Sequence, residues 1–95
     1  MARARNIKPG FFRDEHIVEL PFEARLLFIG LWTLADREGR LKDRPNQIKI
    51  DIFPCDNVKV DKLLDQLAEK RFIIRYQVDG ERYIQVVNFT KHQNP

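Results

Sequence analysis

An amphipathic stretch followed at once by two short β-prone runs constrains the fold of this chain more than any other feature. Residues 56–71 repeat apolar side chains at a spacing of three and four, which marks one face of a helix. The apolar positions are Val60, Leu63, Leu64 and Leu67. Residues 72–78 and 81–89 follow, both rich in β-branched and aromatic residues, and Asp79-Gly80 between them is a strong hairpin signal. The sequence therefore predicts a helix that runs directly into a two-stranded β-ribbon.

The pairing register of the ribbon decides which of its side chains reach the core. A three-residue loop that places Gly80 in the left-handed region would pair Gln77 with Glu81 and leave one face apolar. The apolar face would consist of Phe72, Ile74, Tyr76, Ile84 and Val86. A two-residue loop would instead pair Arg75 with Ile84 and mix polar and apolar residues on both faces. Burial therefore favours the longer loop, with Ile74 and Ile84 in the core.

Ahead of this region the pattern predicts two further helices and a short strand. Pro21 suits a first helical position, and residues 24–35 are apolar nearly all round, as expected of a buried core helix. Residues 39–43, GRLKD, can supply a strand that pairs with the ribbon. Asp43 is the predicted cap and Pro45 the predicted start of the next helix. The expected fold is α+β, a winged helix-turn-helix of three or four helices with a C-terminal β-hairpin wing.

Composition and charge fit one small domain with a basic amino end. The chain has 95 residues, a hydrophobic content of 43% and a net charge of +3, which permits a polyanionic partner without requiring one. Residues 1–13 carry four basic side chains and no acid, so we expect an unpacked arm ahead of an anchor at Phe11-Phe12. A basic end that only aids solubility is the alternative. The predicted domain occupies residues 14–89, and residues 90–95 are expected to begin a linker or tail.

The helix after Val58 carries two stripes of opposite charge. At 100° per residue, one edge of its apolar face consists of Lys59, Lys62, Gln66 and Lys70. The other side consists of Asp61, Asp65 and Glu69. The basic edge can reach phosphates and base edges in a major groove, where glutamine pairs with adenine. The acids would repel phosphate, so a solvated face with Lys62 and Asp65 as an ion pair remains an equal alternative.

Basic side chains outside this helix complete the predicted DNA-binding set. Arg75 and Arg82 lie on the predicted wing, where Asp79 and Glu81 offset their charge. Arg3 and Arg5 of the arm are expected to follow a phosphate backbone. Lys49 on the second helix is the remaining candidate.

Residues that could carry out catalysis are sparse. The chain contains no serine, and its two histidines, His16 and His92, are far apart in sequence. The single cysteine, Cys55, excludes an internal disulfide and has no neighbouring histidine or second cysteine. We therefore expect a protein that is not an enzyme and that uses no cofactor and no metal. With no signal peptide or long apolar run, we expect it to be soluble and cytoplasmic.

The segments RNIKPGFF, ARLLFIGLWTLADREGRLKDRP, RYQVDGERYIQVVNF and KHQNP give the chain a family resemblance. Together with the VDKLLDQL helix, they resemble the N-terminal winged-helix domain of bacteriophage and prophage replication proteins, a group akin to the replisome-organiser and DnaD-like proteins. The resemblance implies origin binding or helicase loading in a bacterial host cell, with DNA as partner, in the double-stranded form in our reading. It also allows self-association or contact with a replicative helicase, and such domains often stand at the front of a longer protein. One departure is Arg71, where winged helices commonly carry glycine.

An interaction or dimerisation module of the replication machinery is the second hypothesis, and a phage transcriptional regulator of the same fold is the third. Neither involves a membrane.

Overall fold

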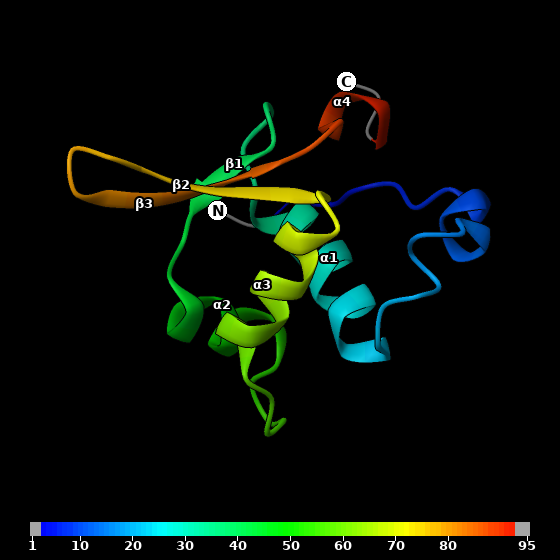
Figure 1. Ribbon diagram of the computed structural model, residues 1–95, viewed down its shortest axis with the longest axis horizontal. Coiled ribbons are helices and arrows are strands. Elements are labelled where there is room, and N and C mark those ends of the chain that lie inside the picture. The colour runs from blue at the N-terminus through cyan, green and yellow to red at the C-terminus, as the bar shows by residue number, and fades with distance from the viewer. Residues whose placement is uncertain (1–2, 93–95) are drawn as a thin grey trace.

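The computed structural model describes residues 3–92, with side chains described as far as residue 90. Its helices are α1 (Phe22–Leu34), α2 (Pro45–Ile52), α3 (Val60–Glu69) and the short α4 (Phe89–His92), and its strands are β1 (Arg40–Lys42), β2 (Ile73–Val78) and β3 (Glu81–Val86). A 3-10 helix, Pro9–Arg13, precedes α1, and residues 15–19 between them form turns. Three helices followed by an antiparallel hairpin, with β1 between α1 and α2, confirm the predicted winged-helix topology (Figure 1).

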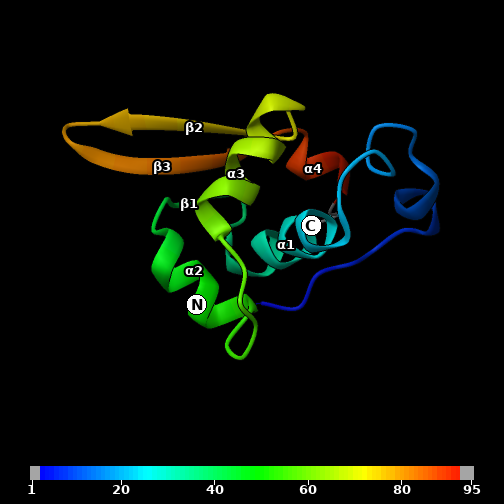
Figure 2. The ribbon, with the colours of Figure 1, turned by 60° about the horizontal axis from the view of Figure 1, so that its bottom comes forward.

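The core forms where the helices pack against one side of the three-stranded sheet. Both views place α1 and α2 on the same side of the sheet, and the β2–β3 hairpin projects beyond them (Figures 1 and 2). Helix α1 is apolar on most of its surface because it lies centrally, and Phe28 and Trp32 are almost completely buried. The ring of Phe28 also lies 5.2 Å from that of Phe72, which joins the helix to the end of α3. Burial of these large side chains, together with the rest of the apolar core, stabilises the domain.

The ribbon has a shorter loop than the sequence predicts. Strand β3 is central, with β1 and β2 paired antiparallel on its two sides. Val78 pairs with Glu81, so the loop contains only Asp79 and Gly80, whose φ angles are 51° and 83°. Positive φ at both central residues is what a type I′ hairpin turn requires. The prediction for Gly80 is confirmed, as is the pairing of residues 40–42 with the ribbon, but the three-residue loop is wrong.

This register exchanges the predicted faces of β2. Ile73 is buried, whereas Ile74 is 53% exposed, so the expected core position of Ile74 is wrong and that of Ile84 is confirmed. Arg75 pairs with Ile84 and shares its inward face. The prediction failed because it assumed that an arginine cannot lie on the inward face of the sheet. Carboxylates from elsewhere in the chain pair with Arg75 and allow it to lie on that face.

Helix α3 ends in a left-handed residue even though that residue is an arginine. Arg71 has φ 65°, the backbone region in which glycine is usually found. Its N–H donates to the carbonyl of Ala68, and the N–H of Phe72 donates to the carbonyl of Leu67, each at 3.0 Å. These two bonds form a Schellman motif, so the helix closes in the normal way without glycine and leads directly into β2.

The amino-terminal arm is packed from its first described residue. The Arg3 N–H donates to the Thr33 carbonyl at 2.8 Å. The Arg5 guanidinium donates to the Trp32 carbonyl at 2.9 Å and lies 5.0 Å from the centre of the Phe89 ring. The expectation of an unpacked arm is therefore wrong for residues 3–5, and residues 1–2 lie outside the described part. Likewise α4 occupies the start of the predicted tail, and residues 93–95 are not described.

Candidate nucleic-acid interface

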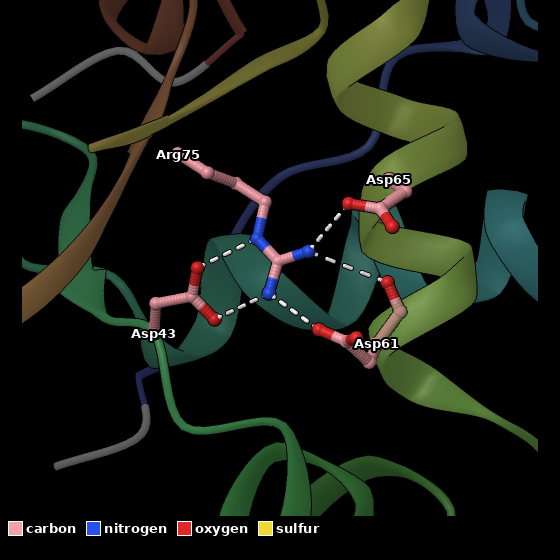
Figure 3. A network of polar contacts seen from close by, with 4 residues as sticks. All are labelled: Asp43, Asp61, Asp65 and Arg75. Atoms are coloured by element: carbon pink, nitrogen blue, oxygen red, sulfur yellow. Dashed lines mark hydrogen bonds and ion pairs between the residues drawn. The ribbon is translucent and has the colours of Figure 1, made fainter.

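A four-residue ionic cluster occupies the angle between the hairpin and α3. We call it the Arg75 cluster, and it consists of Arg75 with Asp43, Asp61 and Asp65 (Figure 3). Arg75 donates two hydrogen bonds to Asp43, from Nε to Oδ2 at 2.6 Å and from Nη2 to Oδ1 at 2.9 Å. It also reaches Asp61 at 2.7 Å and Asp65 at 2.8 Å. A guanidinium matches this arrangement because its donors point in fixed directions in one plane.

The cluster neutralises Arg75 and leaves an excess of negative charge. The Asp43 side chain is only 2% exposed, and its hydrogen bonds raise the pKa of the Arg75 guanidinium above its ordinary value, with Asp61 adding to the effect against the opposing influence of burial. Three carboxylates surround one cation, so two negative charges remain uncompensated within the cluster. With its donors occupied, Arg75 is a structural residue, and the prediction that it contacts DNA is not supported.

Asp43 was predicted to cap α2, and that prediction is wrong. The residue before the helix is Arg44, and within the described chain no side-chain hydrogen bond caps this helix start. Asp43 turns towards β2 because Arg75 offers it two charge-assisted hydrogen bonds. In place of the pair with Lys62 that the alternative reading expected, Asp65 accepts a hydrogen bond from Arg75.

Lysines from α2 and from the start of α3 gather around one surface hollow. This hollow lies between α2 and the start of α3, and we call it the lysine hollow. It is lined by Pro45, Asn46, Lys49, Val58, Lys59, Val60, Asp61 and Lys62. Lys59 and Lys62 are exposed and have no carboxylate partner in the described part of the chain, while Lys49 Nζ donates one hydrogen bond to the Phe53 carbonyl at 3.3 Å. The structure thus brings together three of the predicted basic residues.

The rest of the predicted basic edge of α3 does not join them. Gln66 is half-buried, and its side-chain oxygen is buried without a hydrogen-bond partner among the described residues. Lys70, at the far end of the helix, forms an ion pair with Glu19 at 2.9 Å. That bond lowers the pKa of the Glu19 carboxyl below its ordinary value. Only the amino-terminal half of the edge is therefore open to a ligand.

The remaining predicted residues lie elsewhere. Arg82 pairs with Gln77 on the hairpin and lines a shallow groove with members of the Arg75 cluster. Arg3 has an exposed side chain, whereas Arg5 is occupied at the carboxyl end of α1. Sequence reasoning missed Arg44, which is exposed directly before α2, and Asn46 in the lysine hollow. The signal for both was their position at a predicted helix start.

The described residues give no support for a metal site or for a membrane-spanning helix. Residues 3–92 contain no grouping of three histidine, cysteine or acidic side chains placed to hold a metal ion. Within the same range, every helix is too short or too polar to cross a membrane. Comparison with known protein families, with curated proteins and with solved structures yields no match.

Proposed function

We propose that this chain is a DNA-binding winged-helix domain of a phage-type replication protein and that the lysine hollow holds the phosphates of duplex DNA. The observation that carries the proposal is the grouping of Lys59 and Lys62, at the start of α3, with Lys49 from the last turn of α2 around one hollow. Helix starts expose backbone N–H groups and the positive end of the helix dipole, which favours phosphate. Unpaired lysines add the salt-dependent attraction that dominates protein–DNA affinity.

The carboxylate in the hollow is partly compensated. Asp61 lines the hollow, but its Oδ1 accepts a hydrogen bond from Arg75 at 2.7 Å. The guanidinium therefore draws this carboxylate towards the hairpin and reduces its repulsion of a phosphate near Lys59 and Lys62.

The distribution of charge also favours one orientation of the duplex. The Arg75 cluster carries its excess negative charge on the hairpin-facing edge of α3, whereas Lys59 and Lys62 lie on the other charged edge of the same helix. DNA that docks in the hollow meets Asp61 but avoids Asp43 and Asp65, which do not line it. We infer that α3 enters the groove by its amino end and that the wing contributes little.

The resemblance to phage and prophage replication proteins supports the biological setting. Origin binding or helicase loading in the cytoplasm of a bacterial host fits a small domain that grips duplex phosphates. Proteins of many functions share this fold, so the proposal of DNA binding is tested by measuring the binding of a short duplex.

Salt-dependent binding of a short duplex tests the proposal. Lys59→Gln and Lys62→Gln should each weaken binding and flatten the slope of log K against log salt by about 0.9. Lys70→Gln is the matched control, since Lys70 lies on the same helix edge but is paired with Glu19, and it should leave the slope unchanged. Equal slopes for the wild type and both hollow variants would reject the proposal.

An interaction module is the second candidate because the Arg75 cluster offers a patch of excess negative charge. Asp61 and Asp65 are 65% and 70% exposed and could meet a basic partner surface. Sedimentation of the free domain, and binding to a replicative helicase, distinguish this candidate. Salt-sensitive association with either protein partner, together with no duplex binding, would favour it.

A further inference from the structure

The sheet face that points away from the helices carries a row of basic and aromatic side chains. Lys42 of β1 pairs with Tyr83 of β3, and Tyr83 pairs with Tyr76 of β2, so the three residues form one row across the sheet. Their neighbours Leu41 and Ile84 pair with each other, and Ile84 is fully buried on the inward side. Because side chains alternate along a strand, the register that fills the core also turns this row outward.

The two tyrosines form an aromatic platform. The rings of Tyr76 and Tyr83 stack with centroids 5.7 Å apart and planes inclined by 27°. Ile74 and Val78 share this face and are 53% and 50% exposed, so no described element covers it at those positions. A surface hollow lies beside the platform, and its lining includes Lys42 and both tyrosines.

Uncompensated positive charge lies on β1 and on the residues directly before and after it. The exposed cations of residues 36–44 are Arg37, Arg40, Lys42 and Arg44. Glu38 pairs with Arg40 at 3.1 Å, and Asp43 is bound to Arg75, so two of the acids in the segment are already engaged. The third acid, Asp36, accepts hydrogen bonds from the backbone of residues 38 and 40.

Three cations of the segment therefore remain available. Arg37, Lys42 and Arg44 have no carboxylate partner within residues 3–92. At the tip of the hairpin Asp79 and Glu81 are exposed, which directs a polyanion towards β1.

We propose that this outer sheet face binds single-stranded nucleic acid, with bases stacked on Tyr76 and Tyr83 and phosphates held by Lys42 and Arg44. Aromatic rings beside a basic track form the usual combination for single strands, whose bases are free to stack. In a duplex the bases are stacked within the helix, so its flat faces are not offered to the tyrosines. The inference goes beyond the proposed duplex binding and does not rest on it, because the platform shares no residue with the lysine hollow.

The test measures fluorescence anisotropy of a labelled oligothymidine of about 15 nucleotides, near the upper site size for such surfaces. Tyr76→Leu and Tyr83→Leu keep an apolar side chain but remove the ring, and each should weaken binding by about tenfold. Lys42→Gln should flatten the salt dependence by about 0.7, the expected change for one single-strand phosphate contact. Lys70→Gln is the matched control and should leave single-strand binding unchanged, because Lys70 is paired with Glu19.

A second readout works on the unaltered protein. The chain has two tyrosines and one tryptophan, and Trp32 is only 1% exposed. Stacking of bases on the platform should quench the tyrosine emission while the tryptophan emission stays constant. This signal remains informative if a tyrosine variant fails to fold.

The outcomes separate the two proposals. Loss of single-strand binding in folded tyrosine variants, with tyrosine quenching in the wild type, supports the platform whether or not the duplex binds. Single-strand binding that depends on Lys62 and not on the tyrosines overturns the platform and leaves the lysine hollow intact. Absence of single-strand binding in the wild type also overturns the platform. This holds even if the tyrosine variants abolish self-association of the domain.

Discussion

The two charged edges of α3 show how one helix can serve two purposes. On the acidic edge, Asp61 and Asp65 lie against Arg75, whose side chain is only 16% exposed. On the basic edge, Lys59 and Lys62 are exposed and have no carboxylate partner in the described chain. Both edges appear in the sequence as solvated stripes of similar strength. A charge with an internal partner holds the fold together, whereas a charge without one is available to a ligand.

The largest effect is expected when Arg75, the cation paired with the acidic edge of α3, is removed. Arg75→Met should lower the free energy of unfolding by about 2–4 kcal/mol, because Asp43 would stay buried without its partner. Urea denaturation measures the change. Arg82→Met on the neighbouring strand is the control, and since Arg82 is exposed it should change stability by less than about 0.5 kcal/mol. Equal effects of the two substitutions would break the distinction between paired and free charges.

A smaller effect is expected at the arm, where the same distinction separates two arginines. Arg5 donates hydrogen bonds to the carbonyls of Trp32 and Ala35 and lies over Phe89, so Arg5→Met should cost about 1–2 kcal/mol. Thermal unfolding provides the measurement. Arg3→Met is the matched control, because the only hydrogen bond of Arg3 described above comes from its backbone, and the melting temperature should hardly move. A stable Arg5 variant would mean that the arm does not contribute to the domain.

The smallest effect concerns an exposed ion pair. The hydrogen bond from Lys70 lowers the pKa of Glu19, and its charge adds to the shift, so Lys70→Met should return that pKa towards the ordinary value. A lowered folded-state pKa stabilises the fold at pH values above the unfolded pKa, and this contribution disappears as the pH falls through the folded pKa. An NMR titration of the Glu19 carboxyl follows the change, with Lys62→Met as control. A Glu19 pKa that is the same with and without Lys70 would show that the pair does not persist in solution.

The candidate site was predicted in part. Lys49, Lys59 and Lys62 were named from the sequence and meet in the lysine hollow, because the helix periodicity and the helix starts at Pro45 and Val60 determine where they project. Lys70 and Gln66 were placed on the same edge correctly, but the sequence does not reveal Glu19 beside one or the burial of the other. Such contacts depend on segments far apart in the chain.

Local pattern by itself determined α3 and the turn of the hairpin that follows it. The three-and-four spacing of apolar residues specifies α3, and Asp79-Gly80 places the turn, because both features act within a few residues. The left-handed Arg71 was decided by the tertiary structure, since the hairpin must leave the helix in that direction for its inward side chains to enter the core.

The pairing register of β2 with β3 was determined only by the tertiary structure. The alternation of residues 72–86 favours a three-residue loop when Arg75 is considered apart from the rest of the chain. Asp43, which is 32 positions away, and two carboxylates of α3 make an inward arginine acceptable, and the ribbon then takes the two-residue turn that Asp79-Gly80 prefers. Burying a charge is costly alone and tolerable when it is paired, and the pairing partners are known only once the chain has folded.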